Sequence, residues 1–136
     1  MANFEIFKYE LLIREHHLDT FGHVNNATYL EILEEARWEF VTARGFGLEA
    51  IHKAGRGPIV LALDIKFQRE IKLRQTIRIE SQMIAYEKKI GTLNQCIFNE
   101  QEECCCQVKM TFGLFDLNER KLIMPTPQWL DVMGMS

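Results

Sequence analysis

The sequence predicts an α+β fold in which an antiparallel sheet wraps around one long helix. Apolar residues recur at helical spacing over residues 26–44, and four strand-like segments follow. Short polar connections join the later strands, which favours antiparallel pairing. A helix with so broad an apolar face must be covered, and the long strands are the elements available to cover it.

The first expected element is a strand over residues 4–14. Phe4 and Ile6, and then Leu11 and Ile13, lie among charged residues as a strand would place them. The helix over residues 26–44 follows and is expected to be long and largely buried. Its apolar positions are Tyr29, Leu30, Leu33, Ala36, Trp38, Phe40 and Val41.

Capping residues mark both ends of this helix. Asn25 and Asn26 suit its start, because a short amide side chain can accept from backbone N–H groups that a helix leaves unpaired. Arg44 followed by Gly45 and Gly47 suits its end, since glycine readily adopts the left-handed conformation there. The boundaries of the helix are therefore well defined by the sequence.

After the helix the periodicity becomes strand-like. Residues 48–53 are expected to form a short helical turn and residues 55–58 a turn of the chain. Connections such as residues 87–89 are too short for parallel crossovers, so antiparallel hairpins are expected. A last turn of helix is expected from Pro125. The expected strands cover residues 59–68, 76–86, 90–98 and 104–117.

Length and composition indicate a single domain over residues 1–136. The chain has 47% hydrophobic and 26% charged residues, with no internal repeat or linker. A net charge of −3 gives no basic patch, so nucleic acid is not an expected partner. No run approaches the roughly 20 apolar residues of a membrane span, and the N-terminus does not resemble a signal peptide. A soluble, cytoplasmic protein without membrane insertion is expected.

The four cysteines match neither a disulfide framework nor a metal-binding Cys-x-x-Cys pair. Cys96 stands alone, and Cys104, Cys105 and Cys106 are consecutive. On a regular strand Cys104 and Cys106 would share one face and Cys105 would lie on the other. We expect reduced thiols that act as small buried side chains, in preference to a metal site.

A dense polar segment leads into the long helix and carries a resemblance. Asp19-x-x-Gly22-His23-Val24-Asn25-Asn26, then Tyr29-Leu30 and Glu34-Glu35-Ala36-Arg37, resembles the hotdog-fold acyl-CoA thioesterases of the 4-hydroxybenzoyl-CoA thioesterase-like superfamily. Within it, HVNN followed by YLEILEEARWEF is most similar to the bacterial enzymes that act on medium- to long-chain fatty acyl-CoA. The resemblance covers nearly the whole chain and implies a hotdog fold, a sheet wrapped around one central helix.

Thioester hydrolysis needs a carboxylate and a set of N–H donors where the oxyanion develops. By the resemblance, Asp19 is expected to be the base or nucleophile. The Asn26 backbone N–H is expected to be the oxyanion donor, at the positive end of the helix dipole. Gly22 would let the loop pass close to the thioester. The residues expected to contact substrate are Gly22, His23, Asn25 and Tyr29.

Other readings of these residues and of the function stay open. An Asp just before a helix is commonly a turn former, a loop His is commonly a hydrogen-bonding scaffold, and Tyr29 is expected to pack in the core. Glu34 or Glu35 is the second choice of catalytic carboxylate if Asp19 does not serve. The alternative functions are an aryl-CoA thioesterase, a hotdog dehydratase or hydratase using His23 and Asp19, and a non-catalytic acyl-CoA-binding protein.

The resemblance also implies a homodimer or homotetramer, with the acyl-CoA site between two subunits. A single sheet around one helix leaves an edge strand exposed, and pairing would cover it. Coenzyme A is expected only as part of the substrate, with no metal or redox cofactor. The cations that could bind its phosphates are Arg56, Lys66, Arg69, Lys72, Arg74, Lys88 and Lys89.

Overall fold

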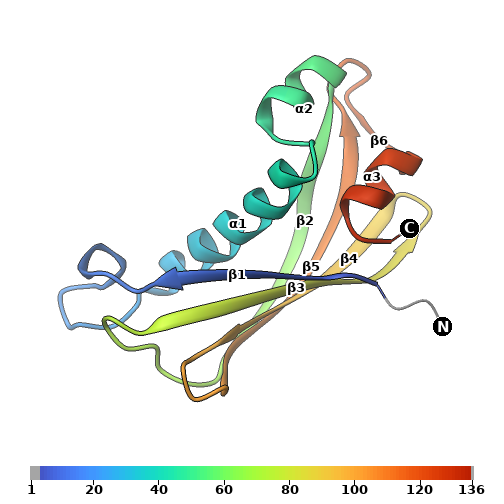
Figure 1. The fold of residues 1–136 in the computed structure, drawn as a ribbon. Helices are drawn as coiled ribbons and strands as arrows, with labels where there is room; N and C mark the ends of the chain where they lie inside the picture. The colour runs from blue at the N-terminus through green and yellow to red at the C-terminus, as the bar shows by residue number, and fades with distance from the viewer. Residues whose placement is uncertain (1–3, 136) are drawn as a thin grey trace.

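A computed structural model of the protein describes residues 4–135. The long helix α1 lies along one face of a twisted sheet, and α2 and α3 lie toward its C-terminal end (Figure 1). In chain order the elements are β1 (Ile6–Leu12), the 3₁₀ turn η1 (Glu15–His17), α1 (Asn26–Ala43), α2 (Leu48–Ala54), β2 (Arg56–Phe67), β3 (Thr76–Glu87), β4 (Ile90–Phe98), β5 (Cys104–Asp116), β6 (Lys121–Ile123) and α3 (Pro127–Val132).

The sheet has the order β1-β3-β4-β5-β2, with β6 added on β5, and each pair of neighbours is antiparallel. The antiparallel hairpins expected from the short connections are therefore confirmed. β1 and β2 are the edge strands, and β2 runs beside α1 in the opposite direction. This α+β arrangement, a sheet curved around one helix, confirms the predicted fold class.

The core lies between α1 and the inner face of the sheet. Leu33, Ala36 and Phe40 of α1 are buried, and β4 alternates as expected, with Leu93 and Ile97 fully buried. Trp129 of α3 is also fully buried and lies edge-on to Phe112, with ring centroids 6.2 Å apart. Because Thr126 accepts from the Trp129 backbone N–H and caps α3, this tryptophan is held at the C-terminal end of the core. The last helical turn expected from Pro125 is confirmed.

The turn expected over residues 55–58 is wrong for most of its length. Only Gly55 turns, with a φ of 71° that ends α2, and Arg56 already begins β2. Pro58 fits the strand because β2 is an edge strand, where a missing N–H donor is tolerated. Gly57 lies so close to Ile51 that an added Cβ would meet its Cγ2 at 2.7 Å. Here the glycine serves helix–strand packing.

The expected alternation of the three consecutive cysteines is also wrong. Cys105 and Cys106 are both buried and Cys104 is half-buried, because the register of β4 against β5 shifts at this point. Ile97 lies opposite Cys106 and Phe98 lies opposite Cys104, so Cys105 is the extra residue of a bulge. The bulge turns two neighbouring side chains toward the interior.

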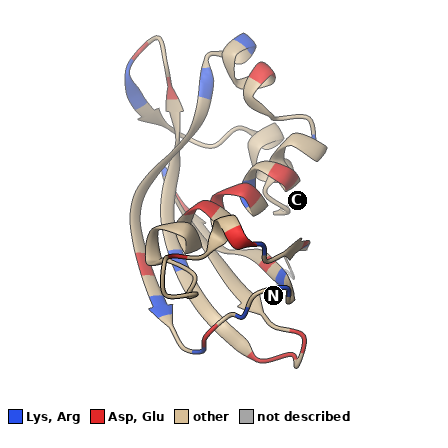
Figure 2. Cartoon of the chain, turned by 90° about the vertical axis from the view of Figure 1, so that its left-hand side faces the viewer, with Lys and Arg blue, Asp and Glu red and all other residues tan. Residues whose placement is uncertain are grey.

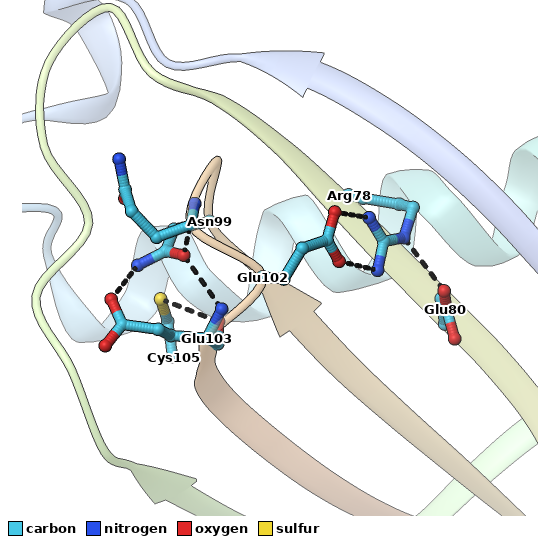
Figure 3. Close-up of polar contacts among 7 residues, drawn as sticks. Arg78, Glu80, Asn99, Glu102, Glu103 and Cys105 are labelled. Carbon is cyan, nitrogen blue, oxygen red and sulfur yellow. Dashed lines mark hydrogen bonds and ion pairs between the residues drawn. The ribbon is translucent and has the colours of Figure 1, made fainter.

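Side chains hold the turn between β4 and β5 in place (Figure 3). The Asn99 carboxamide oxygen accepts from the backbone N–H groups of Gln101 and Glu103, at 3.0 and 2.9 Å. Arg78 of β3 donates to both carboxylate oxygens of Glu102, at 2.9 and 2.6 Å, and to Glu80 at 2.8 Å. This bidentate pair fastens the turn to β3 and keeps the pKa of Glu102 below its ordinary range.

The helix is less completely buried than its sequence pattern predicted. Leu30 and Trp38 are 39% and 36% exposed, although both were expected on the buried face. Acidic residues recur along α1, as Figure 2 shows. Leu30, Glu34 and Trp38 form one ridge at i, i+4 and i+8, which stays exposed among residues 4–135.

Candidate active site

The loop before α1 is a compact, self-bonded turn built around Asp19. One oxygen of its carboxylate, Oδ1, accepts from the backbone N–H groups of Phe21 and His23, at 2.9 and 3.1 Å. The Asp19 backbone also pairs with His23 and Gly22. Since Leu18 and Val24 form a bridge on either side, the loop is closed at its base. Asp19 is therefore both the turn former that its position suggests and an exposed carboxylate. Among residues 4–135 its Oδ2 has no hydrogen-bond partner.

Gly22 has a local conformational role in this loop. Its φ of +80° lies in the left-handed region, which explains the glycine. Nothing in the described chain comes within 4 Å of an added Cβ, so no neighbouring segment requires a close approach. The space beside Gly22 is open, as a substrate approaching the loop would need.

The start of α1 follows the loop directly. Asn25 is the N-cap, and its side chain accepts from the Ala27 backbone N–H at 2.8 Å. Asn26 is the first helical residue, and its own side chain also accepts from Ala27. Among residues 4–135 the Asn26 backbone N–H has no acceptor, so it is a free donor at the positive end of an 18-residue helix. The structure thus brings Asp19 and this donor onto neighbouring turns of one short segment.

His23 lies beside Glu70, a neighbour that the sequence alone could not predict. Its Nε2 lies 3.4 Å from a carboxylate oxygen of Glu70, in the connection between β2 and β3, and both side chains are exposed. Beside Glu70 is an open polar hollow of about 540 Å³. Its lining residues are Gln68, Arg69, Glu70, Lys72, Gln75, Asn99, Gln101 and Glu103. His23 therefore links the loop to the β2–β3 connection.

Tyr29 lies beneath the loop in the core. It is buried, and its ring meets Phe67 of β2 edge-on with centroids 5.0 Å apart. Burial raises the pKa of the Tyr29 hydroxyl to about 12, so this residue is neutral under ordinary conditions. The contact places the C-terminal end of β2 beside the N-terminal end of α1.

A cavity of about 120 Å³ lies at the other end of α1, between α1, β2, β5 and α3. Its lining residues are Glu34, Arg37, Trp38, Phe40, Val41, Pro58, Val60, Met110, Phe112, Trp129 and Met133. Most of these side chains are apolar, and both tryptophans of the chain are among them. Tyr29 does not line this cavity.

The two alternative carboxylates on α1 have different surroundings. Glu35 accepts a hydrogen bond from the Tyr9 hydroxyl at 2.5 Å, and this bond raises the pKa of Tyr9 to about 12. Glu34 instead lines the cavity, eight residues after Asn26. Eight helical residues advance about 12 Å, so Glu34 is well removed from the loop that holds Asp19.

A polar network behind the cavity was not predicted from the sequence. Gln95 is fully buried, accepts from Arg37 at 2.9 Å and donates to the Leu33 carbonyl and the Ser81 hydroxyl. Burial lowers the pKa of Arg37, and the charge of Glu34 offsets part of this effect. The sequence contained one signal for it, because the alternation of Leu93, Gln95 and Ile97 places a polar side chain on the inward face.

The proposed phosphate-binding cations are spread across the molecule. Arg69 and Lys72 line the polar hollow next to Glu70. Arg69 lies 3.1 Å from the Glu103 carboxylate, and Arg74 is paired with Glu15 at 2.7 Å. Arg56 lies at the opposite end of β2 from Phe67, about 36 Å away along an extended strand. Distance from the loop therefore argues against Arg56 and favours Arg69 and Lys72.

Much apolar surface near the loop and along β2 is open. Phe21, beside Asp19, is 85% exposed. Most of β2 is exposed, including Val60, Leu61, Leu63 and Phe67.

No helix among residues 4–135 has the length and apolar character to cross a membrane.

Comparison with known proteins identifies the class to which this arrangement belongs. Residues 13–133 match the family model described as the Thioesterase-like superfamily. The chain belongs to this superfamily. It is a thioesterase, an enzyme that hydrolyses thioesters, and the expected family is confirmed.

Individual relatives agree with this assignment. The thioesterase is 34% identical to the long-chain acyl-CoA thioesterase FadM of Escherichia coli over 116 residues, which is 84% of this chain and 86% of FadM. The YbaW probable thioesterase of Escherichia coli has 28% identity and a TM-score of 0.83, with coverage of 95% of this chain and 97% of that one. An oleoyl thioesterase (putative) of Lactobacillus plantarum has a TM-score of 0.90 at 17% identity, covering 97% of this chain and 52% of that one. At 17% identity, the similarity to this last protein shows a shared fold only.

Proposed function

We propose that this thioesterase hydrolyses medium- to long-chain fatty acyl-CoA to the free acid and CoA, in the cytoplasm. The proposal depends on two features of one short segment: the exposed carboxylate of Asp19 and the backbone N–H at the start of α1, which has no acceptor among residues 4–135. The similarity to FadM, a long-chain acyl-CoA thioesterase, supports the class of substrate. The apolar cavity along the same helix supports an aliphatic acyl group.

In the proposed reaction Asp19 supplies the carboxylate and α1 supplies the oxyanion site. Asp19 Oδ2 either takes a proton from the attacking water or attacks the thioester carbonyl itself to form an anhydride that water then opens. In both routes negative charge grows on the carbonyl oxygen, and the Asn26 N–H would donate to it. The C–S bond then breaks and CoA leaves as a thiol. Its sulfur receives the proton that Asp19 took from water in the first route, and a proton from the water that opens the anhydride in the second.

The Asn26 donor is expected to matter about as much as the carboxylate. Removal of one oxyanion donor typically costs about 2.7–4 kcal/mol of transition-state stabilisation. Here the donor is a backbone group held by the Asn25 cap, so its position depends on the helix start. Tyr29 would support the site from beneath, and Gly22, His23 and Asn25 would border the bound thioester.

A homodimer or homotetramer is part of this proposal. β2 is a 12-residue edge strand that exposes several large apolar side chains, and such edges favour pairing with another strand. Phe21 exposes an aromatic ring beside Asp19, which suits contact with a second subunit. Pairing two copies through β2 would cover the edge and place part of each site next to the partner.

Release of free CoA from a panel of thioesters tests the proposed activity. Acetyl-, decanoyl-, palmitoyl- and benzoyl-CoA would each be incubated with the enzyme, and CoA would be separated chromatographically, because thiol-reactive dyes would also report the free cysteines. We expect the decanoyl and palmitoyl substrates to be hydrolysed best. A preference for benzoyl-CoA would replace the proposal with an aryl-CoA thioesterase. Tight acyl-CoA binding without CoA release would replace it with a binding protein.

A further inference from the structure

An apolar strip connects the two ends of α1 along β2. The residues of β2 on the same face as the buried residues of β5 include Val60 opposite Phe112, Leu63 opposite Met110 and Phe67 opposite Cys106. All three are exposed, by 45%, 40% and 52%. These inward-facing side chains run from the cavity at Val60 to the Tyr29 contact at Phe67.

Two apolar residues of the exposed α1 ridge, Leu30 and Trp38, complete this strip on the helix. Leu30 lies one turn beyond Asn26, and Trp38 lies two turns further and lines the cavity. Both side chains are partly exposed, by 39% and 36%. We define the apolar strip as Leu30, Trp38, Val60, Leu63 and Phe67.

The length of this path corresponds to a long acyl chain. From Asn26 to Glu34, the first cavity residue, α1 advances about 12 Å, and from Asn26 to Trp38 it advances about 18 Å. An extended chain of single bonds advances about 1.2 Å per bond. An octanoyl chain, about 8 Å from carbonyl to methyl, therefore ends before the cavity, whereas a palmitoyl chain of about 18 Å reaches Trp38.

We infer that the cavity is the end of a path that measures acyl chain length, with the acyl group lying on the apolar strip and its methyl end between Trp38, Val60 and Trp129. This inference rests on the proposed function, since it takes the thioester carbonyl to bind at Asn26. Chains of about 14 carbons or more enter the cavity, and chains of 8 carbons do not. Burial of the terminal methylenes favours only the longer substrates, by about fourfold in affinity for each CH₂.

Intrinsic fluorescence tests this directly, because both tryptophans of the chain line the cavity. The wild-type protein would be titrated with S-hexadecyl-CoA and S-octyl-CoA, thioethers that cannot be hydrolysed, at concentrations below micelle formation. Calorimetry would measure binding and emission would report the tryptophans. We expect both compounds to bind, and only S-hexadecyl-CoA to shift the emission to shorter wavelength.

A cavity-filling variant and a matched control test the same inference by turnover. Val60→Phe places a larger side chain in the cavity and is expected to lower kcat/KM for palmitoyl-CoA about tenfold or more. It should leave octanoyl-CoA within about twofold of wild type. Ile59→Phe makes a similar change on the adjacent residue, which faces away from α1 opposite Gly113. This control should match wild type with both substrates.

The outcomes separate this inference from the proposed function. If both thioethers bind but shift the emission equally, or if neither shifts it, the cavity does not measure the acyl chain. Equal losses with both substrates in Val60→Phe would have the same meaning. Absence of turnover with every acyl-CoA and of binding by either thioether would remove the proposed function and this inference together.

Discussion

At the scale of single residues, Gln95 is a buried polar group that joins three elements of the core. Its carboxamide satisfies Arg37, the Leu33 carbonyl and Ser81, and it is fully enclosed. A buried polar network stabilises a fold only when each member is paired, because an unpaired member has lost water without gaining a partner. Gln95 thereby connects β3, β4 and α1 just behind the cavity.

Replacing Gln95 with Met should destabilise the protein by about 3 kcal/mol, because it leaves a partly buried arginine and the buried Ser81 hydroxyl without this partner. The double variant Arg37→Met/Gln95→Met should lose less than the sum of the two single changes, since both polar partners are then apolar. Urea unfolding would measure the midpoints. Strict additivity in this cycle would show that the two side chains do not interact.

The site residues differed in how far the sequence could locate them. Asp19, Asn25 and Asn26 lie on one short segment, so local hydrogen bonding determines their geometry and capping rules predict it. His23 and Glu70 meet only because the β2–β3 connection folds back to the loop. Arg37 and Gln95 are 58 positions apart, and their contact depends on the packing of α1 on β4. Short-range rules contain no information about such pairs.

At the scale of elements, strand and helix boundaries followed the sequence closely where caps or alternation mark them. α1 ends at the predicted position because Gly45 adopts a φ of 87°. The bulge at Cys105, the short strand β6 and the early start of β2 were not predicted. Each depends on the register of neighbouring strands, which residue periodicity does not specify.

Burial of Cys106 in β5 gives the protein a pH-dependent stability that can be measured. Burial raises the pKa of the Cys106 thiol from 9.0 to about 12. In the unfolded chain this thiol ionises near pH 9, whereas in the folded chain it stays neutral. Its contribution is therefore complete below pH 9 and is lost progressively as the pH rises toward 12, by at most about 4 kcal/mol.

Cys106→Ala isolates this effect from other groups that titrate at high pH. The variant should be less stable than wild type at pH 8, because a core side chain is shortened. The difference between the two proteins should shrink between pH 9 and 11 in chemical unfolding experiments, as wild type loses the contribution of the neutral thiol. A difference that stays constant over this range would contradict the burial effect.

At the scale of the whole molecule, the exposed apolar residues of the edge strand β2 favour the proposed pairing of two copies of the chain. Leu61 is 46% exposed, at the point where the register of β2 against β5 shifts. Leu61→Lys should weaken pairing of two copies through this edge, since a charge there opposes burial. Light scattering should show a dimer or tetramer for wild type and a smaller particle for the variant.

Leu48→Lys is the matched control, because Leu48 is 59% exposed on α2 and lies outside β2. It should assemble like wild type. A stable 16.0 kDa particle for the wild-type protein at micromolar concentration would contradict the proposed assembly.

The most direct test of the central claim compares Asp19→Asn with wild type in palmitoyl-CoA hydrolysis. The amide keeps Oδ1 as an acceptor for Phe21 and His23, so the loop should remain folded while the second carboxylate oxygen is lost. Asp64→Asn, on an exposed and outward-facing position of β2, is the control for the same chemical change. We predict that Asp19→Asn lowers kcat about a hundredfold or more and that the control retains activity. Unchanged hydrolysis by a folded Asp19→Asn enzyme would show that Asp19 is not the catalytic carboxylate.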